Sequence, residues 1–211
     1  MFKRSAEHFS YEEIARLVEP GSSVLDLGCG NGELLQLLRD TRDAAVRGVE
    51  IEESMIRECL AKGISVFQGN LDEGLKEYGS GSYDYVILNE TLQVVHEPVQ
   101  IIREMVRVGR TAIVNFPNFG TLLNRLQLSI GGRMPVTKDL PLQWYNTPNI
   151  HFCTRRDFVQ LCREMEIPII AAVDIRHGRR ISPGVANLLA TECCFLLRGS
   201  SAEATRDAGG V

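Results

Sequence analysis

The chain has 211 residues, 44% of them hydrophobic, and a formal net charge of −4 with a pI near 5.6. This length and apolar content suit one domain with a packed core, which we expect over residues 1–198, followed by a disordered tail over residues 199–211. The acidic balance disfavours nucleic acid as a partner. Because apolar runs stay below the roughly 18 residues of a membrane span and the N-terminus lacks a signal-peptide stretch, we expect a cytoplasmic protein without membrane contact.

Strand and helix patterns alternate along the whole chain. Apolar runs predict seven strands, over residues 24–27, 44–49, 64–69, 83–88, 111–116, 167–174 and 190–197. Amphipathic runs predict helices over residues 10–19, 33–38, 55–62 and 98–108, with a further helix starting near Thr154. This alternation is typical of an α/β protein with a mainly parallel sheet covered on both faces.

A glycine-rich turn, Gly28-Cys29-Gly30-Asn31-Gly32, follows the first strand. Gly28 and Gly30 let the backbone turn sharply and approach a ligand, although any α/β protein could use such a turn. The dinucleotide motif has its third glycine where Glu33 stands, and no Lys or Arg lies between residues 17 and 38, which disfavours a pyrophosphate. S-adenosylmethionine has a sulfonium and an ammonium and no phosphate, and it suits Asp26; a helix-capping role for Asp26 stays open.

Polar residues also follow the next three strands. Glu50 ends the second strand, where a carboxylate can accept hydrogen bonds from ribose hydroxyls, or where a surface acid could simply be solvated. Asn70-Leu71 follows the third strand, on the adenine side of such a fold, and Asn89 ends the fourth.

These four junctions resemble the class I S-adenosylmethionine-dependent methyltransferase fold. The resemblance implies a Rossmann-like, seven-stranded, mainly parallel sheet with helices on both faces, and S-adenosyl-L-methionine or S-adenosyl-L-homocysteine as the cofactor. The cofactor-binding residues that it implies are Asp26, Gly28, Gly30, Glu50, Ile51, Asn70, Leu71 and Asn89.

Residues 117–153, called the insertion below, are too long for a simple connection between the fifth strand and the next helix. In open α/β sheets such segments border the binding crevice, so we expect the insertion to form a cap or a partner surface. Trp144 and Tyr145 suit either an acceptor pocket or a protein interface. His151 is a candidate catalytic base, or a structural histidine beside Asn149.

Four segments narrow the resemblance to one family. Residues 66–75, 115–120, 132–137 and 144–151 resemble the methionine biosynthesis protein MetW, although the family has Asp where this chain has Asn70. The resemblance implies a cytoplasmic protein of methionine biosynthesis that supports or regulates homoserine O-acyltransferase. The alternative is a small-molecule methyltransferase. Asn89-Glu90-Thr91-Leu92 stands where an amino-methylating enzyme has Asn-Pro-Pro-Tyr, so whether the chain is an enzyme stays open.

The six cysteines, at positions 29, 59, 153, 162, 193 and 194, include no Cys-x-x-Cys pair. Their scattered, core-like settings predict reduced thiols and argue against a structural metal site. The basic cluster Arg176-His177-Gly178-Arg179-Arg180 is interpreted as a solvated loop in preference to a site for a polyanion.

Overall fold

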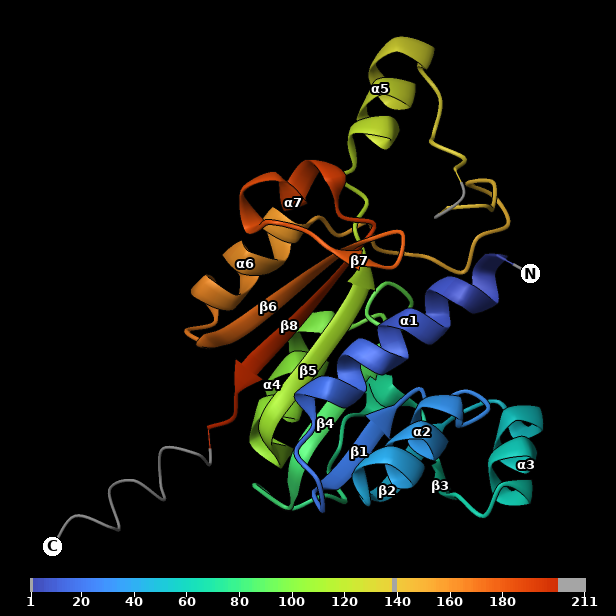
Figure 1. Ribbon diagram of the computed structural model, residues 1–211, viewed down its shortest axis with the longest axis vertical. Coiled ribbons are helices and arrows are strands. Elements are labelled where there is room, and N and C mark those ends of the chain that lie inside the picture. Colours follow the sequence, from blue (N-terminus) through green and yellow to red (C-terminus); the bar gives the residue numbers. More distant parts are fainter. Residues whose placement is uncertain (1, 138–139, 201–211) are drawn as a thin grey trace, which may run out of the picture.

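The structure is a computed structural model that describes residues 2–137 and 140–200, and the side chains from residue 10 onward within those ranges. Its centre is a sheet of eight strands in the order β3-β2-β1-β4-β5-β8-β6-β7 (Figure 1). The strands are β1 Ser23–Leu27, β2 Ala45–Glu50, β3 Ser65–Gln68, β4 Tyr83–Asn89, β5 Gly109–Pro117, β6 Ile169–Arg176, β7 Arg179–Arg180 and β8 Glu192–Arg198.

The order of the strands reverses at β1. Strands β2 and β3 follow on one side of β1, and β4 and β5 lie on the other, all in parallel pairs. Strand β8 runs antiparallel between β5 and β6. The carboxyl ends of β1, β2 and β4 therefore meet at one edge, at the position where open α/β sheets bind ligands.

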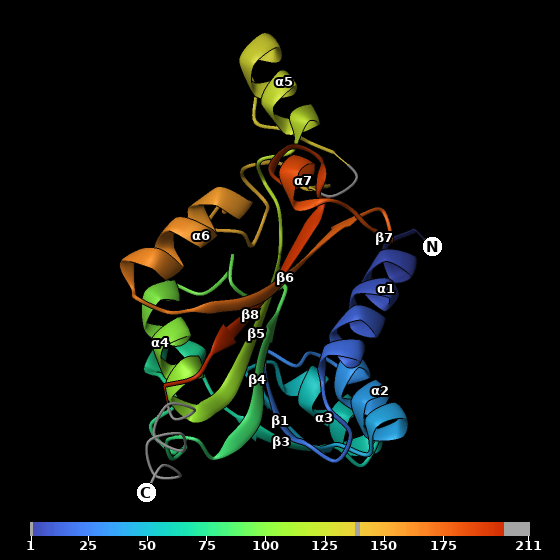
Figure 2. The ribbon, with the colours of Figure 1, turned by 60° about the vertical axis from the view of Figure 1, so that its left-hand side comes forward.

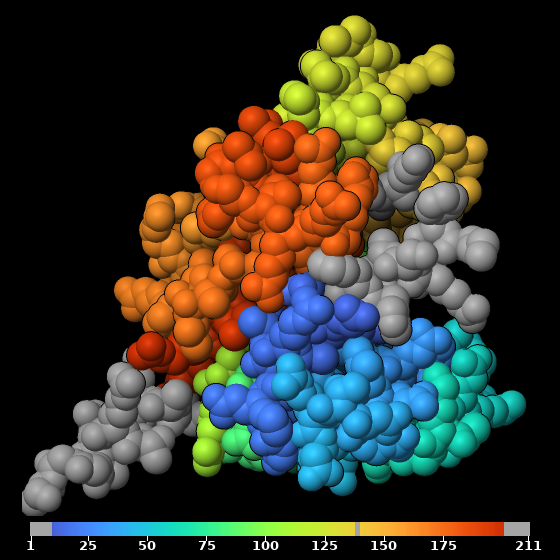
Figure 3. All heavy atoms as spheres, viewed as in Figure 1, coloured from blue at the N-terminus to red at the C-terminus, as the bar shows by residue number. Residues whose placement is uncertain are grey.

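Helices cover both faces of the sheet. They are α1 Phe2–Leu17, α2 Glu33–Arg42, α3 Glu53–Ala61, α4 Pro98–Val108, α5 Leu122–Gly131, α6 Arg155–Glu164 and α7 Pro183–Leu189, with a short 3-10 helix, η1, over Leu71–Glu73. Seen along the sheet, α4 and α6 lie on one side and α1 and α2 on the other (Figure 2). Helix α5 projects from the body, which the space-filling view also shows (Figure 3).

Each face has its own apolar core. On the α1–α2 face, Ile14 and Leu38 are buried together with Val24 and Ile87 of the sheet. On the opposite face, three buried aromatic rings meet between β5, β8 and α6. The ring centroid of Phe158 lies 5.0 Å from that of Phe116 and 4.8 Å from that of Phe195. These layers hold the strand ends in fixed positions, because close-packed interiors resist small displacements.

The fold matches the expected class, with one strand more than the predicted seven. The added strand is β7, which with β6 forms a hairpin from the cluster interpreted as a loop. His177 and Gly178 have φ values of 46° and 77°, as a two-residue hairpin turn with positive φ at both positions requires. Arg180 of β7 donates to Glu13 of α1 at 2.6 Å.

Other elements also differ from the predicted ones. Helix α1 begins at Phe2 and ends at Leu17, whereas the predicted helix covers residues 10–19. The seven-residue helix α7 is absent from the predicted elements. At the predicted tail, the backbone N–H groups of Gly199 and Ser200 still donate to Arg110 and Val106, and residues 201–211 lie outside the described part of the chain. Within the described ranges, no helix is long and apolar enough to cross a membrane.

Helix α6 begins with a capping box. The Thr154 hydroxyl accepts from the Asp157 backbone N–H, and the Asp157 side chain accepts in return from the backbone N–H of Thr154. Thr154→Ala is expected to lower the free energy of unfolding by about 1 kcal/mol. Urea denaturation measures this change. Ser54→Ala is the matched control, because Ser54 lies inside α3 and its hydroxyl donates only to the exposed Glu52 carboxylate; an equal loss in both variants would contradict the capping argument.

Candidate cofactor site

The glycine turn after β1 has the backbone that only glycine adopts freely. Gly28, Gly30 and Gly32 have φ values of 72°, 52° and 78°. The backbone N–H groups of Gly28 and Cys29 both donate to the carbonyl oxygen of Val49, at 2.8 and 3.1 Å. A Cβ atom on Gly28 would lie 2.8 Å from the Thr91 hydroxyl oxygen. The turn is therefore fixed between β2 and the loop after β4.

Glu50 connects this turn to the start of α3. Its carboxylate accepts from the backbone N–H groups of Gly30 at 2.8 Å, Ile51 at 2.7 Å and Glu52 at 2.9 Å. A carboxylate has about four acceptor positions, so about one remains for a ligand hydroxyl. Glu50, which was predicted to bind the ribose, thus also holds the turn in place, and this second role was not predicted.

Asp26 lies beneath the turn as a buried carboxyl group. It is 2% exposed, and its Oδ1 atom has no hydrogen-bond partner among the described residues. Burial, with the nearby Glu50 charge as a second cause, raises the pKa of Asp26 to about 7. A positive group close above would stabilise the ionised form, because an opposite charge lowers the pKa of an acid.

The expected adenine side is open and apolar. Ile51, directly after Glu50, is 62% exposed, and Phe67 at the end of β3 is also exposed. Asn70 is exposed, but its side-chain oxygen already accepts from the Asp72 backbone N–H at 3.1 Å as the cap of η1. Leu71 packs against the core. Ile51 and Phe67 thus offer surface for an aromatic base.

Asn89 ends β4 beside its neighbour in β5. Its side-chain oxygen accepts from the Asn115 amide at 2.8 Å, while Asn115 Oδ1 has no partner among the described residues. The Asn89 backbone carbonyl accepts from the Thr91 hydroxyl at 3.0 Å. Asn89 therefore lies at the same edge as Gly28, because Thr91 contacts both.

The insertion returns to this edge at its end. The backbone N–H groups of Ile150 and His151 both donate to the Gln93 carbonyl oxygen, in the loop after β4. The His151 side chain is exposed. Trp144 and Tyr145 are 69% and 70% exposed and pack edge to face, with 5.7 Å between ring centroids. The structure thus places the pair at the surface, where an interface can use it, while His151 lies nearer the strand ends.

Two contacts at the turn come from residues that the sequence did not single out. The Lys62 ammonium donates to the Asn31 carbonyl at 2.7 Å, and the Cys59 thiol lies 3.2 Å from the Gly30 carbonyl. Burial raises the pKa of the Cys59 thiol, which argues against a nucleophilic role. Both residues are distant in sequence from the turn, and no local pattern marks them.

The family model described as "Methionine biosynthesis protein MetW" matches residues 8–197. The chain belongs to this family. A protein described as "Bifunctional methionine biosynthesis protein MetXA/MetW", from Rhodopirellula baltica, is 39% identical over 183 residues, which are 82% of this chain and 29% of that protein. The ubiquinone biosynthesis O-methyltransferase of Hahella chejuensis is 33% identical over 100 residues, 45% of this chain and 42% of that enzyme. The chain thus spans less than half the length of either relative.

Solved structures show the same fold. A possible histamine N-methyltransferase from Thermotoga maritima aligns with a TM-score of 0.68 at 16% identity, covering 94% of this chain and 92% of that one. The magnesium protoporphyrin IX methyltransferase of Synechocystis, solved with bound SAH, aligns with a TM-score of 0.67 at 20% identity, covering 93% and 85%. This chain therefore has the class I methyltransferase fold and is a methyltransferase-like protein of methionine biosynthesis.

The buried Asp26 carboxyl predicts an unusual dependence of stability on pH. Its pKa is about 7 in the folded protein and about 3.9 in the unfolded chain, so between these values the folded state holds the extra proton. Stability should therefore fall as the pH rises from about 4 to about 7, by up to about 4 kcal/mol. Urea unfolding across this range, compared with Asp26→Asn, measures the effect. The contributions of the other carboxyl groups are the same in both proteins and cancel in the comparison. If the free energy of unfolding changed with pH in parallel for both proteins, the expected contribution of Asp26 would be contradicted.

Proposed function

We propose that this protein is a regulatory module that binds S-adenosyl-L-methionine or S-adenosyl-L-homocysteine and supports homoserine O-acyltransferase through its insertion. The partner is proposed from the Rhodopirellula protein, whose description joins MetXA and MetW in one chain. We identify the MetXA part with homoserine O-acyltransferase. A fusion keeps its two parts at a high effective concentration, so the corresponding separate proteins would have to associate in order to act together in the same way.

The geometry of the turn supports the cofactor. Asp26 would face the ammonium or sulfonium of the ligand with its unpartnered oxygen. The cation that the structure places at the turn, Lys62, donates to the Asn31 carbonyl oxygen. Glu50 retains about one acceptor position for a ribose hydroxyl. Ile51 and Phe67 would contact the adenine ring. A phosphate ligand would meet two acids here, so the site favours a cationic nucleoside.

The cofactor proposal predicts a specific loss of affinity. Ile51→Ala should weaken the binding of S-adenosyl-L-homocysteine about tenfold, because the variant removes methylene groups that the base would cover. Isothermal titration measures the affinity. The matched control is Leu60→Ala in α3, since Leu60 is exposed to a similar degree and lies away from the strand ends. Equal affinities in both variants, or no binding by the unaltered protein at about millimolar concentration, would overturn the assignment.

The insertion has the surface that an interface requires. Helix α5 has Asn124 as its buried residue, and its exposed apolar side chains are Leu122, Leu123, Leu126, Leu128 and Ile130. Trp144 and Tyr145 add two exposed aromatic rings. Contiguous exposed apolar side chains mark interaction sites, and Trp and Tyr are enriched among the residues that dominate binding energy.

Co-purification with homoserine O-acyltransferase tests the partner. Trp144→Ala should weaken the complex by about 2 kcal/mol, roughly 30-fold, if its ring is an anchor. Val185→Ala, at an exposed position of α7 outside the insertion, is the control. Retention of full affinity by Trp144→Ala, Tyr145→Ala and Leu126→Ala would exclude the insertion as the interface, and failure to form a complex would exclude the partner. Neither result bears on cofactor binding, which the titration tests separately.

A small-molecule methyltransferase is the competing function, and the similarity to the Hahella O-methyltransferase favours it. Transfer of label from S-adenosylmethionine to metabolites of the methionine pathway decides between the two. If a folded, cofactor-loaded protein transfers no label while it raises the activity of the acyltransferase, the regulatory function is supported.

A further inference from the structure

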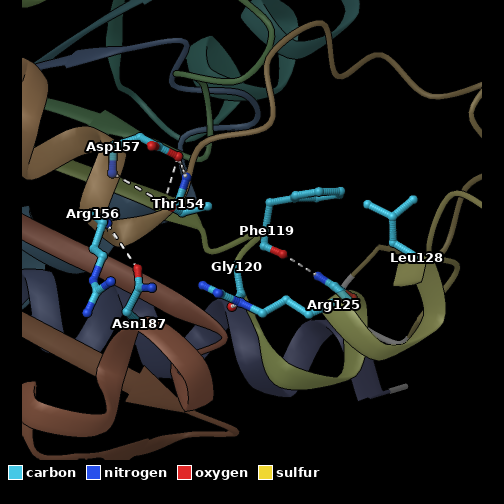
Figure 4. A pocket seen from close by; sticks show the side chains of 9 residues that line it. Phe119, Gly120, Arg125, Leu128, Thr154, Arg156, Asp157 and Asn187 are labelled. Atoms are coloured by element: carbon cyan, nitrogen blue, oxygen red, sulfur yellow. Dashed lines mark hydrogen bonds between the residues drawn. The ribbon is translucent and has the colours of Figure 1, made fainter. Parts of the chain in front are cut away.

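A cavity lies outside the candidate cofactor site, between the insertion and the body of the protein. Its volume is about 340 Å³, within the usual range for small-molecule pockets. The loop after β5, helix α5, the start of α6 and helix α7 form its walls (Figure 4). The lining residues are Phe119, Gly120, Asn124, Arg125, Leu128, Thr154, Arg156, Asp157 and Asn187.

One group of lining side chains offers unused donors. Arg125 uses its Nε–H on the Gly120 carbonyl at 2.7 Å, and its two terminal nitrogens have no partner among the described residues. The Arg156 guanidinium likewise has none in the described part of the chain. Figure 4 shows the Arg125 side chain extending from α5 toward Gly120, on the side of the cavity where Arg156 and Asn187 lie. Two guanidinium groups suit a carboxylate, because their fixed fork matches its geometry.

A second group offers unused acceptors. Asn124 is 3% exposed and donates to the Phe119 carbonyl at 2.9 Å, while its Oδ1 atom has no partner among the described residues. In Asp157, Oδ2 takes the Thr154 backbone N–H and hydroxyl, and Oδ1 has no partner in the described chain. Asp157 is exposed, whereas the Asn124 oxygen is buried. Because buried acceptors are normally satisfied, Asn124 favours a ligand with an N–H donor, such as an ammonium group.

Two apolar side chains complete the lining. Phe119 packs on Phe152, with 4.6 Å between ring centroids, and Leu128 of α5 is exposed. The cavity therefore combines positive donors, neutral and negative acceptors, and an apolar wall. A ligand that matches all three has a carboxylate, an ammonium group and a short apolar chain.

We infer that this cavity binds a free α-amino acid with an apolar side chain. The carboxylate would lie between Arg125 and Arg156, the ammonium group toward the Asn124 oxygen, and the side chain against Phe119 and Leu128. The inference rests on neither the cofactor nor the partner. Because Arg125 belongs to α5 and Arg156 to α6, the ligand would connect the projecting helix to the body and so fix the orientation of the insertion.

Binding of L-methionine to the purified protein tests this inference, since it has all three groups and the family serves methionine biosynthesis. Methioninamide lacks the carboxylate and N-acetylmethionine lacks the ammonium group. L-methionine should bind at least about tenfold more tightly than either analogue, because each removes a charge-assisted interaction. Backbone amide NMR shifts report the affinity and should cluster at residues 119–125 and 154–157 and at Asn187.

Single substitutions test whether L-methionine binds in this cavity. Arg156→Gln and Arg125→Gln should each lower the affinity for L-methionine about tenfold, while Arg163→Gln, which replaces another α6 arginine outside the cavity, should leave it unchanged. Circular dichroism confirms that each variant is folded. The inference is overturned by absence of binding at about 10 mM, by equal binding of either analogue, or by unchanged affinity in Arg156→Gln. Tight binding of N-acetylmethionine would assign the cavity to simple carboxylates instead.

Discussion

The Glu50 carboxylate holds the ligand edge of this protein together. It accepts three backbone N–H groups, one from the glycine turn and two from the start of α3, at 2.7 to 2.9 Å. These groups come from two loops that pack on neighbouring strands, and a buried N–H without a partner would be costly. The site geometry therefore depends on one side chain that fixes the turn and that we propose also binds the ligand, so removing it would not separate the two roles.

The local parts of the site could be predicted from sequence because they follow from local backbone chemistry. Gly28 and Gly30 adopt positive φ, and the Thr154 capping box starts α6 where the pattern placed a helix. The hydrogen bond from Gly30 to Glu50 could not be predicted, because it joins the turn after β1 to a residue at the end of β2. The same limit applies to Lys62 and Thr91, whose contacts depend on how α3 and the β4 loop pack.

Short elements account for the differences in the fold. Strand β7 has two residues and forms only because His177 and Gly178 turn the chain back on β6. Helix α7 has seven residues, too few for a clear helical period, although Pro183 at its first turn is a recognisable start signal. The alternation of strand and helix patterns alone indicates an α/β protein. The four strand junctions added the resemblance to the class I methyltransferase fold, and the resemblance to one family supplied the candidate partner.

The burial of Asp26 would couple the binding of a cationic ligand at the strand ends to the release of a proton. Its carboxyl group is partly protonated near neutral pH, because its pKa is about 7. A cationic ligand above it would release part of this proton to the solvent, since the ligand favours the ionised form. The net charge gained by the complex would then be smaller than the charge of the ligand. The measured heat of binding would also vary with the ionisation enthalpy of the buffer, which takes up the released proton.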